Sequence, residues 1–375
     1  MDYCLICTKC ACVYERDSSI FRCGKCGGIL EVSYDYSTLK LPKRFANAKI
    51  SQKKYVPLFP VSGKLASLGE GGTSLDKAQI KGLDDNGTKL YLKVETGNPT
   101  RSFKDRGSSV EITKALEFGY TDIVCASTGN MGLSLATYSK ENNMKCTIFM
   151  SRNGNREKME RIKRAGGIVI KVDGDFNAAT TLAERYAKAK GAFACGDYHY
   201  RKEGQKSVAY EIVEQLHYNV PDYIFIQVGN ATLIAAMYKA LREFRRLKFI
   251  RKLPKLVAAQ SKECDPLVRA FDSNGKIRHI APRTIADAIA VGYPTFGNEG
   301  LEAVKKTRGA AQSVDDKAIK HYGAVLENEL GVLSEPGGAA GFACFMENYA
   351  CNKKAFEDKE VVVIITGNNE HRKDD

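Results

Sequence analysis

Several features of other protein classes are missing from this 375-residue sequence. It has no apolar stretch of membrane-spanning length, because its densest apolar run, VVVII at residues 361–365, suits a buried strand. The first residues, MDYCLICTKC, have neither the basic region nor the apolar core of a secretion signal, and we find no internal repeat or low-complexity segment. We therefore expect a cytoplasmic protein without a membrane partner. Its twelve cysteines should be reduced thiols or metal thiolates rather than disulfides.

Acidic residues are in deficit, since 57 Lys and Arg stand against 44 Asp and Glu and give a formal charge of +13. Part of the excess lies in REFRRLKFIRKLPK (residues 242–255), which is typical of a solvated helix face running into a linker. Aromatic residues are thinly interleaved there and no base-reading motif accompanies them, which argues against nucleic acid as a partner. An overall positive potential would attract an anionic small molecule.

Apolar strands and amphipathic helices alternate beyond residue 120. The expected strands are DIVCAS (122–127), KCTIFM (145–150), IVIKVDG (168–174), DYIFIQV (222–228), LVAAQS (256–261) and EVVVIITG (360–367). The expected helices are MGLSLATYSKENN (131–143), REKMERIKRAGG (156–167), FNAATTLAERYAKAKG (176–191), EGQKSVAYEIVEQLH (203–217) and one beginning IAAMYKALREF (234–244). This alternation predicts an α/β fold with a largely parallel sheet covered on both faces, and the length predicts two domains.

Six of the twelve cysteines lie within the first 26 residues. Cys7-x-x-Cys10 and Cys23-x-x-Cys26 are separated by twelve residues, the spacing of a tetrahedral zinc ribbon. Cys4-x-x-Cys7 is a competing register. We prefer the first register because CVYE after the first pair mirrors CGGILEVSYD after the second. The prediction is a structural Zn²⁺ held by these four thiolates.

The segment NPTRSFKDRG puts Lys104 directly after Phe103, among turn formers and charges. A catalytic lysine needs this setting, although a solvated surface lysine is the alternative. Three loops, STGN (127–130), VGNATL (228–233) and TGNN (366–369), each follow an expected strand, where open α/β sheets bind ligands. The first two can present backbone amides to a carboxylate or phosphate. Together these features predict a lysine, an anionic cofactor and an amino-acid carboxylate in one cleft.

Seven motifs occur in the order found in threonine synthases: LGEGGTSL (68–75), NPTRSFKDRG (98–107), CASTGNMGLSLA (125–136), EGQKS (203–207), VGNATL (228–233), TIADAIAVGYP (284–294) and TG (366–367). The sequence resembles that family over essentially its whole length, and SFKDRG is highly specific to fold-type II pyridoxal-phosphate enzymes. The resemblance implies two open, mostly parallel sheets covered by helices, as in the tryptophan synthase β-like fold, with an N-terminal zinc ribbon. It also implies a homodimer. The domains implied are a ribbon over residues 1–35, a large cofactor-binding domain over 36–99 and 206–375, and a small domain over 100–205.

The resemblance also implies the residues that hold pyridoxal 5′-phosphate. Lys104 would form the Schiff base, Phe103 would help to desolvate it, and Asn130 would hydrogen-bond the cofactor's phenolic oxygen. Thr366 would face the pyridine nitrogen, where a neutral hydroxyl does not hold that nitrogen protonated. Backbone amides at a helix N-terminus and the Thr232 hydroxyl would bind the cofactor phosphate, through Gly229, Asn230, Ala231, Thr232 and Leu233. Ser127 and Thr128 would bind the substrate α-carboxylate.

Several substrate-side residues depart from the family pattern. Arg101 stands where glycine is usual, Met131 where threonine is common, and Cys195-Gly196 where an Asn-Ser pair helps to hold the substrate phosphate. Arg201 is retained. Arg101 and Arg201 would meet at the side-chain end of a bound amino acid, and two arginines favour a compact dianion such as phosphate. The alternative is that Arg101 faces solvent or an acidic residue.

These features predict a pyridoxal-phosphate-dependent carbon–oxygen lyase. The resemblance favours a threonine synthase, which converts O-phosphohomoserine and water into threonine and phosphate. One alternative is a related β-replacing or β-eliminating enzyme that acts on O-phosphoserine, as cysteate synthase does, or a serine/threonine dehydratase. An alternative of another class is a basic zinc-ribbon protein that binds nucleic acid without catalysis. Retention of Lys104, Asn130 and Thr366 argues against it.

Overall fold

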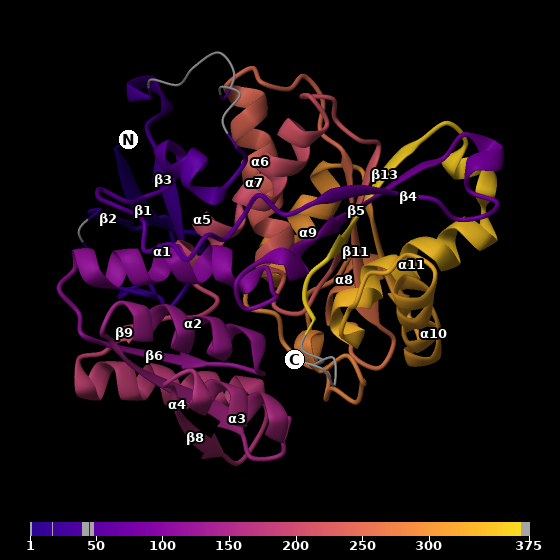
Figure 1. Cartoon of the computed structure of the whole chain (residues 1–375). Coiled ribbons are helices and arrows are strands. Elements are labelled where there is room, and N and C mark those ends of the chain that lie inside the picture. The colour runs from indigo at the N-terminus through magenta and orange to yellow at the C-terminus, as the bar shows by residue number, and fades with distance from the viewer. Residues whose placement is uncertain (1, 17, 40–44, 46–48, 369–375) are drawn as a thin grey trace. The chain divides into compact units, whose positions relative to one another are not determined.

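The computed structural model describes residues 2–16, 18–39, 45 and 49–368 (Figure 1). The segment STLKLPKRFANAK (37–49), with its lysines and proline, is expected to be a linker. Part of this segment, and Asn369 of the TGNN loop, lie outside the described residues. The chain forms two compact units, residues 1–72 with 104–207 and residues 73–103 with 208–375. Residues 36–72 thus belong to the first unit, whereas the resemblance groups them with the C-terminal half. The domain boundaries that the resemblance implies stay a prediction.

The N-terminal segment forms a small antiparallel sheet in the order β2-β1-β3. Its strands are β1 (Tyr3–Cys7), β2 (Val13–Tyr14) and β3 (Leu30–Tyr34). Burial alternates along β1 and β3, so one face of this sheet packs into the first unit and the other is half-exposed. The loops that carry the two cysteine pairs flank these strands.

The first unit also contains a four-stranded parallel sheet in the order β8-β7-β6-β9. Its strands are β6 (Asp122–Ala126), β7 (Lys145–Ser151), β8 (Ile168–Val172) and β9 (Phe193–Ala194). Its helices are α1 (Lys104–Glu117), α2 (Asn130–Glu141), α3 (Arg156–Arg164), α4 (Phe176–Lys190) and α5 (His199–Gln205). Val124 packs in one core with α4, whereas Gly132 of α2 lies against Ile148. Helices therefore cover both faces of this sheet.

The second unit contains a six-stranded sheet in the order β12-β11-β10-β13-β5-β4, parallel except for β4. Its strands are β4 (Leu75–Ala78), β5 (Lys89–Val94), β10 (Tyr223–Gln227), β11 (Lys255–Ser261), β12 (Ala310–Val314) and β13 (Glu360–Ile365). Its helices are α6 (Ser207–Gln215), α7 (Thr232–Arg246), α8 (Pro266–Asp272), α9 (Gly297–Lys306), α10 (Asp316–Asn328) and α11 (Pro336–Cys351). Ser207, the first residue of α6, still belongs to the first unit. Phe225 of β10 and Phe345 of α11 meet edge to face with ring centroids 5.4 Å apart, in the core of this unit. The two expected open, mostly parallel sheets are therefore present.

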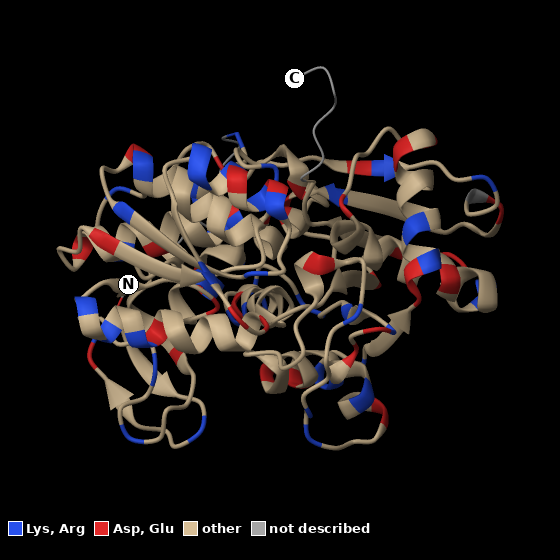
Figure 2. Cartoon of the chain, turned by 90° about the horizontal axis from the view of Figure 1, so that it is seen from below, with Lys and Arg blue, Asp and Glu red and all other residues tan. Residues whose placement is uncertain are grey.

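Short 3₁₀ helices complete the secondary structure, at Tyr36–Thr38, Gln52–Leu58, Asp84–Asn86, Glu95–Gly97, Asp287–Ile289 and Lys353–Phe356. Within the described part of the chain, no helix combines the length and the apolar character that crossing a membrane requires. Figure 2 shows Lys and Arg interspersed with Asp and Glu along the visible ribbon. The positive charge is therefore distributed in this view rather than gathered in one basic stretch.

Candidate active site and cysteine cluster

Lys104 is the first residue of α1 and is half-buried. Burial lowers the pKa of its ammonium group, and the nearby Arg201 guanidinium lowers the pKa further. The carboxylate of Asp197 acts in the opposite direction. A lysine with a lowered pKa exposes more neutral amine, the form that attacks a carbonyl. Lys104 therefore has the chemistry expected of a lysine that binds an aldehyde cofactor.

The start of α1 is fixed by buried polar contacts within the first unit. Ser134 of α2 donates to the Asp105 carboxylate (2.6 Å), and Arg106 donates to the hydroxyl of Ser207 (3.1 Å). The Gln52 amide donates to the carbonyl of Arg106 (2.7 Å). Fully satisfied buried polar groups hold one arrangement, because each would lose its partner if the helix moved. The backbone that carries Lys104 is thus pre-positioned.

A buried ion pair lies behind Lys104. The Arg201 guanidinium pairs with the carboxylate of Glu111 and also donates to the carbonyl of Lys104 (3.1 Å). The amide of Gly196 donates to the other carboxylate oxygen (2.8 Å). Burial raises the pKa of Glu111 to about 7, against the lowering effect of Arg201. Arg201 is fully buried and already engaged within its own unit, so its predicted contact with a substrate phosphate stays a prediction.

Close packing of glycine makes this ion pair possible. A Cβ at Gly107 of α1 would lie 2.6 Å from Cγ of Arg201. A Cβ at Gly204 of α5 would lie 2.0 Å from the carbonyl oxygen of Arg106. Both distances are too short for real carbon atoms, so α1 and α5 approach each other only because these two residues are glycines.

The loop between β6 and α2 contains the predicted carboxylate-binding residues. The Ser127 hydroxyl oxygen accepts from the amides of Gly129 (2.9 Å) and Gly132 (2.8 Å). Gly129 has a φ of +148°, and a Cβ there would lie 2.3 Å from Cδ of Lys158. Asn130 begins α2 and is buried, and Thr128 is half-buried. The loop is therefore locked by its own hydroxyl and by a glycine that no other residue can replace without strain.

The loop between β10 and α7 has the geometry of an anion site. Ala231 adopts a left-handed conformation (φ +60°) as the N-cap of α7, and Thr232 and Leu233 form the first turn. Amides of a first turn have no intrahelical acceptor and point outward, where an anion can accept from them. A Cβ at Gly229 would lie 3.1 Å from Cα of Ile289. Asn230 is held in place because its side-chain oxygen accepts from the amide of Thr295 (3.0 Å). These residues fit a phosphate group.

The chain that leads to Lys104 is paired with the chain that follows β13. The amide of Phe103 donates to the carbonyl of Thr366 (3.0 Å), and Ser102 bridges to Gly367. The amide of Asn368 donates to the carbonyl of Arg101 (3.0 Å). Within the second unit, the structure thus brings Phe103 and Thr366 together.

Arg101 has a φ of +60°, in the left-handed region. Glycine adopts this region without a steric penalty, whereas other residues are strained by their Cβ atom. The glycine that is usual at this position in the family therefore has a physical reason. Arg101 accepts the same backbone turn with strain, and its side chain is half-exposed.

Comparison with known proteins identifies the family. A family model described as pyridoxal-phosphate dependent enzyme matches residues 66–367. The threonine synthase of Methanocaldococcus jannaschii is 35% identical, covering 96% of this chain and 91% of that protein. The threonine synthase of Methanosarcina acetivorans is also 35% identical, covering 97% and 91%. The chain belongs to the threonine synthase family.

The same comparisons confirm that this family member is a pyridoxal-phosphate-dependent enzyme. The structure of maize serine racemase superposes with a TM-score of 0.69 at 24% identity, over 80% of this chain and 88% of that one. At that identity the likeness shows the fold alone. The interpretation as a non-catalytic nucleic-acid binder loses its support.

The residues predicted for the site of this threonine synthase family member occur in both units, and their roles stay predictions. The first unit carries Lys104, Ser127, Thr128, Asn130 and Arg201, and the second carries Arg101, Phe103, Gly229, Asn230, Ala231, Thr232, Leu233 and Thr366. Glu111 and Gln227, whose side-chain nitrogen donates to Thr366 Oγ1 (2.5 Å), were not among the predicted residues. Glu111 lies seven residues after Lys104, on the same helix face, so helical periodicity could have revealed it. Gln227 is a polar residue at the end of the apolar strand β10, which is also a detectable signal.

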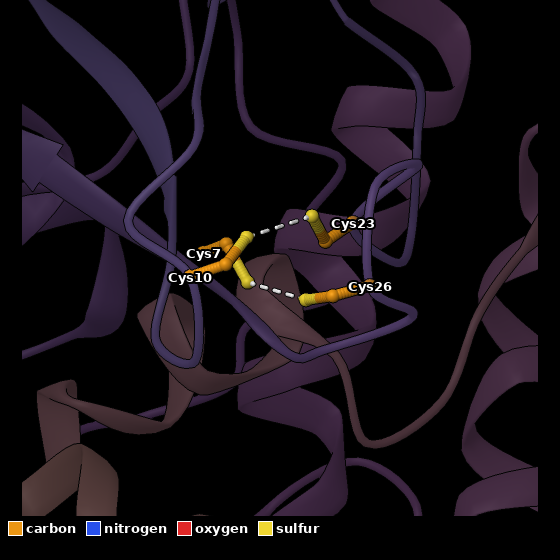
Figure 3. A group of neighbouring side chains, drawn as sticks. All are labelled: Cys7, Cys10, Cys23 and Cys26. Atoms are coloured by element: carbon orange, nitrogen blue, oxygen red, sulfur yellow. Dashed lines mark hydrogen bonds between the residues drawn. The ribbon is translucent and has the colours of Figure 1, made fainter.

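Four cysteines of the N-terminal segment gather in space (Figure 3). The sulfur atoms of Cys7, Cys10, Cys23 and Cys26 all lie within 4.8 Å of one another. The distances Cys7–Cys26 and Cys10–Cys23 are both 3.5 Å. Thiolates around tetrahedral zinc, with Zn–S near 2.3 Å, are about 3.8 Å apart. The cluster therefore fits a zinc ion, in the register that excludes Cys4.

The second cysteine turn depends on glycine. A Cβ at Gly28 would lie 2.9 Å from the sulfur of Cys7 and 3.2 Å from that of Cys26. The amide of Gly27 donates to the carbonyl of Cys23 (2.8 Å), and Gly27 itself has a φ of +67°. This turn brings its two sulfur atoms toward the first pair only because its glycines leave room.

Proposed function

We propose that this chain is a threonine synthase that converts O-phosphohomoserine and water into threonine and phosphate. The observation that carries the proposal is Lys104, which has a pKa lowered by burial at the start of α1 and lies within SFKDRG. The near-full-length similarity to curated threonine synthases supports the choice of reaction.

Pyridoxal phosphate, when bound, takes up the electron pair released as a proton leaves the substrate Cα. In our proposal, Lys104 binds the cofactor covalently and then moves that proton. The first turn of α7 and the Thr232 hydroxyl hold the cofactor phosphate, and Asn130 holds its phenolic oxygen. Thr366 faces the pyridine nitrogen and Phe103 excludes water from Lys104.

Ser127 and Thr128 bind the substrate α-carboxylate in this proposal. The Ser127 oxygen already accepts two amides, so its hydroxyl hydrogen is directed to another acceptor such as a carboxylate. The positive charges of Arg101 and of the buried Arg201 guanidinium would attract the anionic end of the substrate.

Borohydride reduction tests the lysine assignment. The purified protein should be yellow, and reduction should fix the cofactor on the peptide that contains Lys104. Lys104→Ala should remove the label, whereas the same change at the exposed Lys145 should leave it in place. A colourless protein after incubation with pyridoxal phosphate, or label on another lysine, contradicts the assignment.

A side-by-side assay with O-phosphohomoserine, O-phosphoserine, serine and threonine tests the reaction. Threonine formed from O-phosphohomoserine is the expected result. Arg101→Ala should then lower kcat/KM for that substrate at least tenfold, which corresponds to about 1.4 kcal/mol of transition-state binding. If serine or threonine reacts best and Arg101→Ala has no effect, the anionic substrate is wrong.

One observation favours a second candidate, a β-replacing enzyme acting on O-phosphoserine or a serine/threonine dehydratase. At the family's substrate-phosphate positions, Cys195 is buried with a raised pKa and the amide of Gly196 is occupied by Glu111. Both groups are therefore poor donors to a phosphate. Turnover of O-phosphoserine alone, or of serine and threonine only, is the outcome that this candidate predicts.

We further propose that Cys7, Cys10, Cys23 and Cys26 hold one structural Zn²⁺, that the protein is a homodimer, and that it works in the cytoplasm. Four thiolates leave no open position for water, so the metal would take no part in catalysis. Elemental analysis of protein purified without chelator should give one zinc per chain. Absence of metal contradicts the zinc site. If removing the metal abolishes turnover while the folding and the cofactor spectrum stay intact, the role of the metal is not structural.

A further inference from the structure

Gln227 is the last residue of β10 and is 5% exposed. Its side-chain Nε2 donates to Thr366 Oγ1 (2.5 Å) and to the carbonyl of Gly338 (3.0 Å). Among the described residues, its Oε1 has no hydrogen-bond partner. β10 pairs in parallel with β13 as far as Phe225 and Val363, and Gln227 and Thr366 follow two and three residues later. A buried amide is thus aimed at the hydroxyl of Thr366.

The direction of this hydrogen bond follows from Gly338. A backbone carbonyl only accepts, so the end of the Gln227 amide that faces Gly338 must be its NH₂ group. The same nitrogen contacts Thr366 Oγ1, which therefore accepts. A hydroxyl has one hydrogen, and an NH₂ group cannot accept it. The hydrogen of the Thr366 hydroxyl must point away from Gln227.

Packing leaves neither group room to rearrange. A Cβ at Gly341 of α11 would lie 2.9 Å from Oε1 of Gln227, so the helix lies directly against the amide. A Cβ at Gly338 would lie 2.6 Å from the carbonyl oxygen of Gly367. The carbonyl of Thr366 also accepts from the amide of Phe103 (3.0 Å). The backbone of Thr366 is therefore held in place, and its hydroxyl can donate only away from Gln227.

We propose that Gln227 is a positioning residue that makes Thr366 an obligatory hydrogen-bond donor, and so keeps the pyridine nitrogen of the cofactor unprotonated. This inference rests on the proposed contact between Thr366 and that nitrogen. An unprotonated nitrogen has a lone pair that accepts from a hydroxyl, whereas a protonated one needs an acceptor. Because the Thr366 oxygen already accepts from Gln227, the hydroxyl can only donate to the ring nitrogen. It therefore stabilises the unprotonated ring and offers no acceptor to the protonated one.

Removing the Gln227 amide should reverse this preference. In Gln227→Met, the Thr366 oxygen loses its donor and becomes free to accept from a protonated ring nitrogen. One hydrogen bond gained by the protonated form should raise the pKa of the nitrogen by about one unit, a tenfold change in its protonation equilibrium. Methionine has nearly the volume of glutamine, so the core of the second unit should remain packed.

The holoenzyme reconstituted with pyridoxal phosphate labelled with ¹⁵N in the ring tests the proposal directly. The ¹⁵N resonance is followed over pH and compared with that of free cofactor in its protonated and unprotonated forms. In Gln227→Met the resonance should move toward the protonated position at a given pH. The matched control is Gln312→Met on β12, whose side-chain oxygen accepts from Cys344 of α11 (3.8 Å), and it should leave the resonance unchanged.

Thr366→Val separates this inference from the proposed site. Valine removes the donor, so the resonance should move toward the unprotonated ring without a hydrogen bond. A shift in Thr366→Val with none in Gln227→Met overturns the role of Gln227 and leaves the site intact. If neither variant shifts the resonance, Thr366 does not face the nitrogen and both ideas are wrong. A shift in both, in the stated directions, supports the inference.

Discussion

The close approach of α1 and α5 predicts that a single methyl group at Gly107 disrupts the buried ion pair. In Gly107→Ala, the new Cβ would lie 2.6 Å from Cγ and 2.9 Å from Nη1 of Arg201. The side chain cannot withdraw easily, because its guanidinium is bound to Glu111 and the backbone carbonyl of Arg201 lies 3.2 Å from the same Cβ. The methyl group therefore displaces the guanidinium from its carboxylate.

The magnitude follows from three contributions. Overpacking a core costs about 1–3 kcal/mol. Breaking a buried ion pair costs about 3–5 kcal/mol. Replacing glycine by alanine within a helix returns about 1 kcal/mol. We therefore expect Gly107→Ala to lower the free energy of unfolding by at least about 3 kcal/mol.

Gly323→Ala is the matched control, since Gly323 also lies inside a helix, α10. A Cβ there would meet its nearest neighbour, Cβ of Ala339, at 3.7 Å, which is ordinary contact. Only the helix propensity changes, so the free energy of unfolding should rise by about 1 kcal/mol. Urea denaturation followed by tyrosine fluorescence measures both variants, because the chain has 18 tyrosines and no tryptophan. If Gly107→Ala is as stable as the parent protein, the packing argument is refuted.

Three further predictions concern strain, pH and metal. Arg101→Gly should raise the free energy of unfolding by about 0.5–1 kcal/mol, because glycine relieves the strain at φ +60°. The gain is not larger because glycine also makes the unfolded chain more flexible. Arg101→Ala should leave the free energy of unfolding unchanged, and urea denaturation measures both variants. Folding raises the pKa of Glu111 from 4.5 to about 7, so the folded state binds this proton more tightly than the unfolded state does. The protonated carboxyl therefore contributes its whole stabilisation below pH 4.5. This stabilisation, about 3 kcal/mol, is lost as the pH rises through 7. Glu111→Gln should remove this component, and equal pH slopes for parent and variant between pH 5 and 8 would count against it. Gly28→Ala should lower the zinc content measured by elemental analysis, since its Cβ would lie 2.9 Å from the sulfur of Cys7; Gly24→Ala, whose Cβ would meet only the Tyr14 hydroxyl at 3.7 Å, should retain the metal.

The strands of the parallel sheets could be predicted from the sequence because they are continuous apolar runs, as β10 and β13 show. The strand β5 was not predicted. Its Lys93 is fully buried and pairs with Glu211 (2.8 Å). A charged residue in a strand normally indicates an exposed face, and the partner that neutralises it lies far away in the chain. Local patterns contain no sign of such a long-range pair.

The helix expected over residues 203–217 is in fact two helices, α5 and α6, interrupted at Lys206. The hydroxyl of Ser207 donates to the carbonyl of Gly204 (2.7 Å). Serine side chains compete in this way with the backbone hydrogen bonds of a helix. Hydrophobic periodicity continues through the interruption, so it could not reveal the break.

The cofactor residues could be proposed because their motifs are local, as SFKDRG around Lys104 is. The contacts that tune them could not, since each contact joins residues of two different elements. Glu111 and Arg201 meet only after α1 and α5 pack together, and Gln227 reaches Thr366 only once β10 and β13 pair. Which donor a buried group obtains depends on the tertiary structure, and a motif does not record it.

The position of β5 in the sheet has a consequence for synthesis of the chain on the ribosome. This strand pairs in parallel with β13 and antiparallel with β4. About 265 residues separate the end of β5 from the start of β13, and at 5–20 residues per second a ribosome needs roughly 13–53 s to make them. Throughout that interval the β5 edge of the β4–β5 hairpin lacks its partner β13, and unpaired edges attract other chains. A nascent chain of this topology therefore has a defined period in which chaperone binding competes with aggregation, and it ends only when β13 has left the exit tunnel.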